Sequence, residues 1–363
     1  MRHEVPVSIG DPFLVGVVDG RVHVMASPLE RERIATAAPD AVLHDIVDLG
    51  FHELLESGMS FHELDLELTS RASAAMGVRE AVVDPEMPIA ISDRLRADGV
   101  VLHPDHERVA DRRRMKSAAE MAGIRRAQAA AEAGMSAAAA MLREAVPDGE
   151  RLMLGSEALT AESVRAEMRD ACRHHGALAP PDVIVGSVWQ GSGHEPGSGP
   201  LPVSLPIVID LWARDEGSGC WADMARTFVV GEIPDSVRAQ EILVREALER
   251  AREAVRPGVT GRDLHAIVCD LFESAERRTQ RTGPDGDPNE GFQSFLGHGV
   301  GLQVHEEPTL GQVGHDELVA GDVIAVEPGL WQGDIGEVRF EDLLFVTEAG
   351  NESLTDYPYR LMP

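Results

Sequence analysis

The chain has 363 residues, of which 43% are hydrophobic and 26% charged, close to the composition of a globular protein. At roughly 100–200 residues per domain, this length allows two or three domains with cores of ordinary size. Its apolar runs stay well short of the ~18–20 residues that cross a bilayer. The composition therefore excludes a disordered chain and a membrane span.

Acidic residues outnumber basic ones by 62 to 33, which gives a formal net charge of −29. Such a surface repels a polyanion, so we expect no nucleic acid partner. The charge is typical either of a solubilising surface or of carboxylates that converge on cations. Composition alone leaves both interpretations open.

The N-terminal sequence MRHEVPVSIGDPF has neither the apolar core nor the cleavage pattern of a secretory signal. We therefore expect a cytoplasmic protein. The three cysteines, Cys172, Cys220 and Cys269, are odd in number, far apart and outside any Cys-x-x-Cys pair, which argues against a disulfide framework.

The first part of the chain predicts a small α/β domain over residues 1–110. Residues 13–25 alternate apolar and polar positions around Asp19-Gly20, a dipeptide that suits the positive φ angles of a tight hairpin turn. Further elements are expected as helices at 30–36 and 61–76 and strands at 81–83 and 100–102.

A long helix is predicted next. Apolar residues recur in steps of three and four from Ile124 to Leu142 and draw one stripe on a helix, which Pro147 ends. We expect this helix, within 111–147, to connect the first domain to a second one.

The remainder, 148–363, predicts an α+β domain in which strands dominate the two ends and helices the middle, with the helices covering one side of a sheet. The expected helices are 160–174, 235–254 and 263–276, and the expected strands are 183–188, 207–211, 225–230, 323–328 and 337–348.

Five acidic or imidazole side chains fall within or beside this strand-like sequence. They are Asp210, Asp223, His298, Glu327 and Glu341. Carboxylates are costly to bury unless they are paired, hydrogen-bonded or bound to metal. Four carboxylates and an imidazole form a hard, oxygen-rich ligand set suited to Mn²⁺ or another borderline divalent ion. Their four negative charges would offset two such cations, which supports a two-metal site over a one-metal site.

Five sequence motifs, in this order, resemble those of the creatinase/aminopeptidase family, the M24 metallopeptidases with the pita-bread fold. The motifs are IVIDL, ADMARTFVVG, GHGVGLQVHEEP, VIAVEPGL and GEVRFEDLLFVTEAG. The resemblance is strong over 148–363 and weaker over the N-terminal part. It implies a C-terminal pita-bread catalytic domain with a smaller N-terminal α/β domain like that of creatinase.

The resemblance also implies that these five side chains bind two divalent metal ions, with Asp223 and Glu341 bridging. Mn²⁺ is the expected ion, and Co²⁺ and Zn²⁺ are alternatives. A metal-bound hydroxide would attack the scissile carbonyl while Glu327, which is then both ligand and catalytic residue, shuttles the proton.

Three further residues are candidate catalytic or substrate-binding groups. His305 lies seven residues after His298, the spacing of the family's second histidine, which contacts substrate and steadies the tetrahedral intermediate. His194 occupies roughly the position of the family's other substrate-facing histidine. For both, a solvated or structural histidine is the alternative. Arg339 lies two residues before Glu341 in strand-like sequence, so it should share the face of that carboxylate and orient it.

The sequence departs from the family's pattern at several positions. Asp210 and Asp223 are 13 residues apart, two more than is usual in the family, so the hairpin between them should be longer. Trp212 replaces a common glycine and either narrows the site or packs under that hairpin. Ser294 replaces a histidine of many aminopeptidases P and prolidases, and Thr309 replaces an arginine that binds the substrate carboxylate in some dipeptidases. Both argue against a strict prolidase.

From the resemblance we expect an Xaa-Pro aminopeptidase that removes an N-terminal residue preceding proline, from peptides with proline in second position. A prolidase acting on Xaa-Pro dipeptides is the alternative. A non-peptidase hydrolase or a binding protein on the same fold is a further alternative, less favoured because all five ligands are present. The family's N-terminal domain commonly takes part in dimer contacts, so a homodimer is expected.

Overall fold

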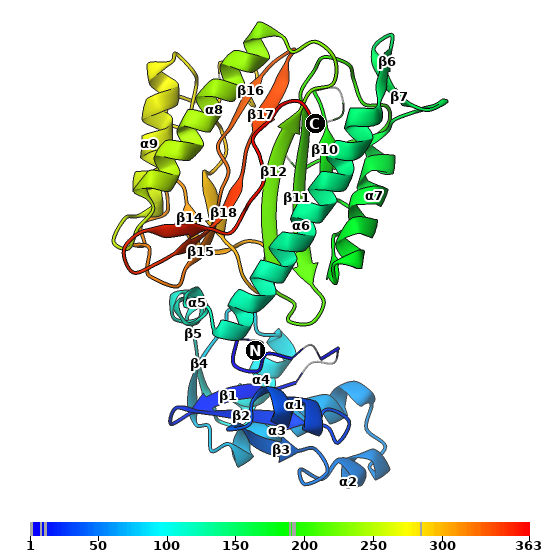
Figure 1. The fold of residues 1–363 in the computed structure, drawn as a ribbon. Coiled ribbons are helices and arrows are strands. Elements are labelled where there is room, and N and C mark those ends of the chain that lie inside the picture. The colour runs from blue at the N-terminus through cyan, green and yellow to red at the C-terminus, as the bar shows by residue number, and fades with distance from the viewer. Residues whose placement is uncertain (1–2, 8, 11–12, 189, 191–193, 284) are drawn as a thin grey trace. The chain divides into compact units, whose positions relative to one another are not determined.

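The computed structural model describes residues 3–7, 9–10, 13–188, 190, 194–283 and 285–363. It divides into two compact units, Met1–Arg113 and Arg114–Pro363, whose elements are labelled in Figure 1. Across the described residues, every helix is too short or too polar to span a membrane.

The first unit is an α/β structure, as predicted. Strands β1 (Val15–Val18) and β2 (Arg21–Ala26) form the expected hairpin, and Asp19 and Gly20 at its turn have φ angles of 49° and 76°. β2 also pairs in parallel with β3 (Val42–Asp45). The other elements are α1 (Arg31–Ala37), α2 (Phe51–Glu56), α3 (Phe61–Ala75), α4 (Ile89–Ala97), α5 (His106–Arg114) and the parallel pair β4 (Glu80–Val83) and β5 (Val101–Pro104).

The long helix α6 (Ala118–Glu144) belongs to the second unit. Its predicted apolar stripe, from Ile124 to Leu142, is fully buried. Ser117 and Glu120 form a capping box at its N-terminus, each bonding the backbone N–H of the other. Because the stripe packs against β11, β12 and α7, α6 is part of the C-terminal unit. It is not the separate connector that the sequence predicts over 111–147.

Two antiparallel sheets form the centre of the second unit. The first has the order β10 (Ile184–Gly186), β11 (Ile207–Asp215), β12 (Trp221–Phe228), with β9 (Ala177–Leu178) also on β11. The second has the order β14 (Glu306–Leu310), β13 (Gly297–Gly299), β15 (Val323–Val326), β18 (Asp342–Val346), β19 (Asn351–Ser353). Smaller sheets are β16 (Gly329–Gln332) with β17 (Gly336–Arg339), and β6 (Val146–Asp148) with β7 (Arg151–Leu154) and β8 (Glu157–Ala158).

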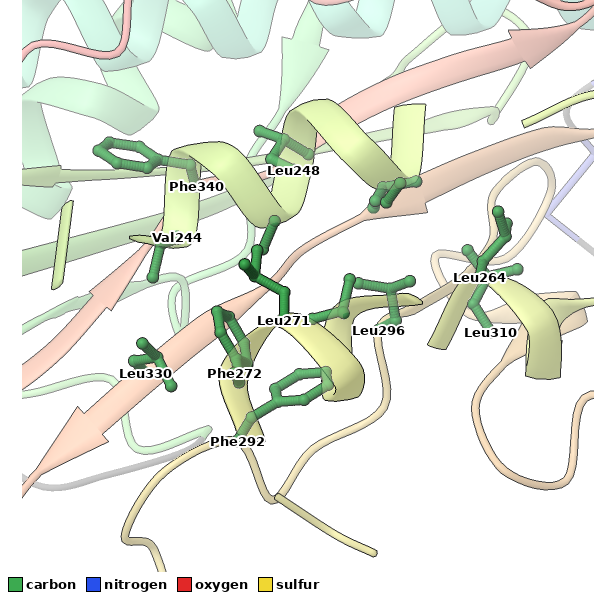
Figure 2. Packing of buried hydrophobic residues seen from close by; sticks show 14 of the residues in the cluster. Val244, Leu248, Leu264, Leu271, Phe272, Phe292, Leu296, Leu310, Leu330 and Phe340 are labelled. Carbon is green, nitrogen blue, oxygen red and sulfur yellow. The ribbon is translucent and has the colours of Figure 1, made fainter. Parts of the chain in front are cut away.

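Each central sheet is backed by its own helices (Figure 1). α6 and α7 (Ala161–His174) pack on the first sheet, while α8 (Asp235–Ala254) and α9 (Gly261–Ser274) pack on strands of the second sheet and on β16 and β17. Figure 2 shows the second of these cores, where Phe272 and Phe292 meet edge to face with ring centroids 5.5 Å apart. The predicted arrangement of a sheet covered by helices is confirmed, and it occurs twice.

The predicted strand over 337–348 is interrupted. β17 ends at Arg339 and β18 begins at Asp342, so Phe340 and Glu341 lie between two strands that belong to different sheets. A run of apolar and charged residues does not reveal such a break. The three cysteines are buried and free, which agrees with the absence of a disulfide framework.

Two buried ion pairs anchor the residues just before α6 within the second unit. Arg114 bonds both carboxylate oxygens of Asp322, at 3.0 and 2.7 Å, and the side chain of Asp322 is 0% exposed. Lys116 pairs with Glu306, and the side chain of Lys116 is 1% exposed. Both pairs connect the start of α6 with segments beside the second sheet.

Arg114→Met should lower the free energy of unfolding of this unit by about 3–5 kcal/mol, because Asp322 stays buried without its cation. Chemical denaturation followed by tryptophan fluorescence measures the loss, since all four tryptophans belong to this unit. The control is Arg125→Met, which breaks an exposed pair with Glu352 and should cost less than about 1 kcal/mol. Equal losses in the two variants would contradict the prediction.

Candidate metal centre

The five predicted ligands converge in the second unit. Their candidate ligand atoms form overlapping groups in which all atoms lie within 4.8 Å of one another. The groups are Asp210 with Asp223 and Glu341, His298 with Glu327 and Glu341, and Asp223 with His298 and His305. The structure therefore brings together all five side chains, from both central sheets, and adds His305 to them.

The β11–β12 hairpin places the two aspartates on one face. Asp223 lies opposite Trp212, and residues two apart on a strand point to the same side, so Asp210 shares that face. The ladder continues past both aspartates to Arg214 opposite Trp221, so the hairpin extends well beyond the site. Trp212 lies beside Asp223 in this ladder, is half-buried and packs against the apolar core under α6.

His298 comes from the other sheet, where β13 pairs with β15. Its Nδ1 lies 3.0 Å from the carbonyl oxygen of Gly299, and because a carbonyl only accepts, Nδ1 donates. Nε2 then carries the free lone pair and lies 3.8 Å from Asp223 Oδ2 and 3.7 Å from Glu327 Oε1. The neighbouring Gly297 has a φ of 155°, and a Cβ there would overlap the carbonyl of Ala325. This backbone approach sets His298 beside the carboxylates.

Burial and mutual repulsion dominate the electrostatics of the acids. Asp223 is 4% exposed and Glu341 1%. Burial, followed by the neighbouring carboxylates, raises the pKa of both well above the usual range. Burial also raises the pKa of Asp210 to about 6, although Arg339 opposes this shift. Burial lowers the pKa of His298 to about 4, so its imidazole is neutral at pH 7.

Arg339 is the cation in contact with this cluster. Its guanidinium donates to Asp210 Oδ2 at 3.0 Å and to Glu327 Oε2 at 3.3 Å, and it pairs with Glu337 at 3.0 Å. The expected bond to Glu341 is replaced by these three, because the chain leaves β17 after Arg339 and the two residues no longer share one strand. Glu337 was missed from sequence, although its position two residues before Arg339 on β17 places both on one face.

Two buried oxygens test whether the residues fit a metal. Oδ1 of Asp223 and Oε1 of Glu341 have no hydrogen-bond partner among the described residues. A buried carboxylate oxygen without a donor is costly, and a cation removes that cost. Since the remaining donors are carboxylate oxygens and one neutral imidazole, the set fits divalent cations.

The two further histidines lie on the open side of the cluster. The rings of His298 and His305 meet edge to face with centroids 4.2 Å apart, and His194 lies 6.2 Å from His305 by the same measure. Both His194 and His305 are exposed. Burial and the neighbouring histidines lower the pKa of His305 to about 4. The structure therefore presents two solvent-accessible imidazoles beside the buried carboxylates.

The unfolding free energy of the protein in chelator should fall between pH 6.5 and 8. His298 and His305 are neutral in the folded state throughout this window, because burial lowers the pKa of each to about 4. In the unfolded chain their pKa returns to about 6.5, so they too become neutral as the pH rises through the window. Asp223 and Glu341 keep protons in the folded state that the unfolded chain has lost, so raising the pH favours unfolding. Excess Mn²⁺ should remove the decline, because it binds the ionised folded site.

Chemical denaturation at each pH measures this dependence, and Glu341→Gln provides the control. The glutamine side chain of this variant is neutral at every pH. The unfolding free energy of the variant in chelator should therefore decline less steeply with pH than that of the wild type. A wild-type stability that rises over this window would contradict the prediction.

The sequence matches curated proteins over part of its length. It is 37% identical over 149 residues to the Xaa-Pro dipeptidase of Pyrococcus furiosus, covering 41% of this chain and 39% of that one. It is 33% identical over 207 residues to the probable dipeptidase PepE of Mycobacterium tuberculosis, covering 56% of this chain and 52% of that one. The chain therefore aligns with about two fifths to one half of the length of these curated relatives.

The fold matches solved structures more completely. The Xaa-Pro dipeptidase from Bacillus anthracis superposes with a TM-score of 0.77 over 99% of this chain and 92% of that one, at 22% identity. This likeness confirms the pita-bread fold with a smaller N-terminal domain. Residues 122–348, which include most of α6 and every predicted ligand, match the sequence pattern of metallopeptidase family M24. With more than half of its length matched, the chain belongs to metallopeptidase family M24.

Proposed function

We propose that the chain is a two-metal Xaa-Pro dipeptidase, a prolidase. The observation that carries the proposal is the buried cluster of four carboxylates and His298, with its two unpartnered oxygens, in a member of family M24. The substrate class is supported by the two sequence relatives, both named as dipeptidases and one as an Xaa-Pro dipeptidase. These names favour prolidase, the alternative of the sequence analysis, over Xaa-Pro aminopeptidase, its first expectation.

The proposed ligands are Asp210, Asp223, His298, Glu327 and Glu341, and the proposed ion is Mn²⁺. Divalent cations in such a site polarise the scissile carbonyl and lower the pKa of water. Glu327 is the proposed proton carrier. Burial raises its pKa, and Arg339 occupies its Oε2, which leaves Oε1 to take up a proton and deliver it to the leaving nitrogen.

His305 and His194 are the proposed substrate contacts. Both are exposed on the open side of the cluster, and His305 is neutral at pH 7, so it can donate a hydrogen bond from an uncharged ring. A donor in that place would stabilise negative charge as it develops on the carbonyl oxygen. Arg339 is engaged with three carboxylates, so we propose that it orients Asp210 and Glu327 and does not bind substrate directly.

Xaa-Pro aminopeptidase activity is the second candidate, and Thr309 favours it. The side chain of Thr309 on β14 is uncharged, and it stands where some dipeptidases of the family carry an arginine for the free carboxylate of a dipeptide. A site without that cation loses an advantage for dipeptides over longer peptides.

The homodimer and the cytoplasmic location stay predictions, and light scattering at micromolar protein should give twice the chain mass.

Hydrolysis of Xaa-Pro dipeptides and Xaa-Pro-Yaa tripeptides, with Mn²⁺ and with chelator, tests the proposal. Mass spectrometry identifies the bond that is cut. We expect Mn²⁺-dependent cleavage confined to the dipeptides. Release of the first residue from the tripeptides as well would make the chain an Xaa-Pro aminopeptidase. Failure to cut either peptide with two Mn²⁺ bound would overturn both candidates in favour of a non-peptidase hydrolase or a binding protein.

Glu341→Ala should abolish the activity, because it removes a carboxylate shared by two of the ligand groups. Residual activity above a few per cent of wild type, measured with saturating Mn²⁺, would contradict the two-metal assignment.

His305→Ala should lower kcat while the Mn²⁺ content stays at the wild-type level, because His305 is proposed to contact substrate. Metal content by elemental analysis and kcat are measured on the same sample. Loss of metal from this variant would make His305 a ligand.

A further inference from the structure

The two central sheets meet beside the metal centre along a seam between β12 and residues 339–342. These segments lie side by side, yet within the described residues they form no regular ladder. One backbone hydrogen bond at the seam runs from the N–H of Glu341 to the carbonyl of Ala225, at 3.0 Å. Side chains supply the other contacts described below.

Thr227 performs the work of a backbone ladder pair at this seam. Its hydroxyl donates to the carbonyl of Arg339 and accepts from the N–H of Arg339, both at 2.9 Å. Thr227 is 0% exposed, so water does not compete for these bonds. This hydroxyl therefore ties the backbone of Arg339, two residues before Glu341 and paired with Gly329 of β16, to β12.

Arg226 holds the other side of Glu341. It is 1% exposed, and all five of its N–H groups have acceptors. The acceptors are the carbonyls of Ala225 (2.8 Å), Glu341 (2.6 Å), Tyr357 (2.8 Å) and Pro358 (3.1 Å), and Oδ1 of Asp342 (2.9 Å). The guanidinium thus joins β12 to the start of β18 and to the C-terminal segment.

These contacts decide where Glu341 stands relative to Asp223. Ala225 and Arg226 bond the N–H and the carbonyl of Glu341, and Asp223 lies two residues before Ala225 on the same strand. Within the cluster of four carboxylates, Asp223 and Glu341 are the acids that carry unpartnered buried oxygens. Their separation is therefore set by this one backbone hydrogen bond together with the side chains at the seam.

We infer that Thr227 and Arg226 are positioning residues that fix the separation of Asp223 and Glu341, and with it the affinity for the second of two cations. This inference rests on the proposed two-metal site. The substrate does not enter it, so it can be tested by metal binding alone.

Thr227→Val removes the hydroxyl while keeping the shape, so the N–H and the carbonyl of Arg339 each lose their hydrogen bond to β12. We expect the affinity for one of the two Mn²⁺ ions to fall by at least about tenfold. A loss of this size is typical when a group that orients a metal ligand is removed. Calorimetric titration of metal-free protein measures the two affinities. Electron paramagnetic resonance should show a weaker signal of interacting Mn²⁺ pairs. Thr227→Ser keeps the hydroxyl, so its Mn²⁺ affinities and its signal of interacting Mn²⁺ pairs should be close to those of the wild type.

Thr355→Val is the matched control. The buried Thr355 hydroxyl accepts from the N–H of Leu343 at 2.9 Å, and Leu343 lies on β18, two residues after Glu341. The Thr355→Val variant should lose about as much stability as Thr227→Val and keep both Mn²⁺ affinities. Thr227→Cys, which keeps a weak donor and acceptor, should give an intermediate loss of affinity and serves if the valine variant does not fold.

Unchanged Mn²⁺ affinities in folded Thr227→Val or Thr227→Cys would overturn the inference, since the hydroxyl would then act on stability alone. Wild-type protein that binds fewer than two Mn²⁺ ions would overturn it as well. Wild-type protein that binds two Mn²⁺ ions and cuts no Xaa-Pro peptide would leave the inference standing while the proposed function fails.

Discussion

Repulsion between buried carboxylates is the constraint on which the second unit depends. Burial raises the pKa values of Asp210, Asp223, Glu327 and Glu341, and for all but Glu327 the neighbouring acids of the cluster raise them further. One guanidinium, that of Arg339, contacts two of the four. Such a group opposes folding unless protons or cations neutralise it. The surrounding structure must therefore hold the acids against a force that drives them apart.

Two features of the fold supply that resistance. Each central sheet has an apolar helix layer of its own, so the face that carries the acids is backed by close-packed side chains. Where the sheets meet, bonds from buried side chains take the place of a ladder, and the two acids of the cluster that have unpartnered buried oxygens, Asp223 and Glu341, lie there. The two apolar cores make each central sheet rigid, and the seam sets the distance between the two sheets.

Much of this was predictable from sequence, because the chemistry is concentrated in short motifs. The five predicted ligands stand in strand-like segments of fixed spacing, and the structure brings all five together with His305. The partners of Arg339 were not predictable, because the chain changes sheets at Phe340 and Glu341, and only long-range packing decides that. The prediction that α6 is a separate connector was also wrong. The apolar stripe predicts a helix, but it does not show which unit buries that helix. The seam escaped notice because the roles of Arg226 and Thr227 depend on residues more than a hundred positions away.

Lys116 is the only lysine in the chain, and its ammonium is buried against Glu306, the residue next to His305. An amine-acylating reagent therefore reaches a lysine side chain only while the start of α6 separates from the turn that bears this histidine. The rate at which the peptide containing Lys116 gains the mass of the acyl group therefore measures how often the structure opens on this side of the site. Residues that react elsewhere do not obscure the count, and no label has to be engineered into the chain.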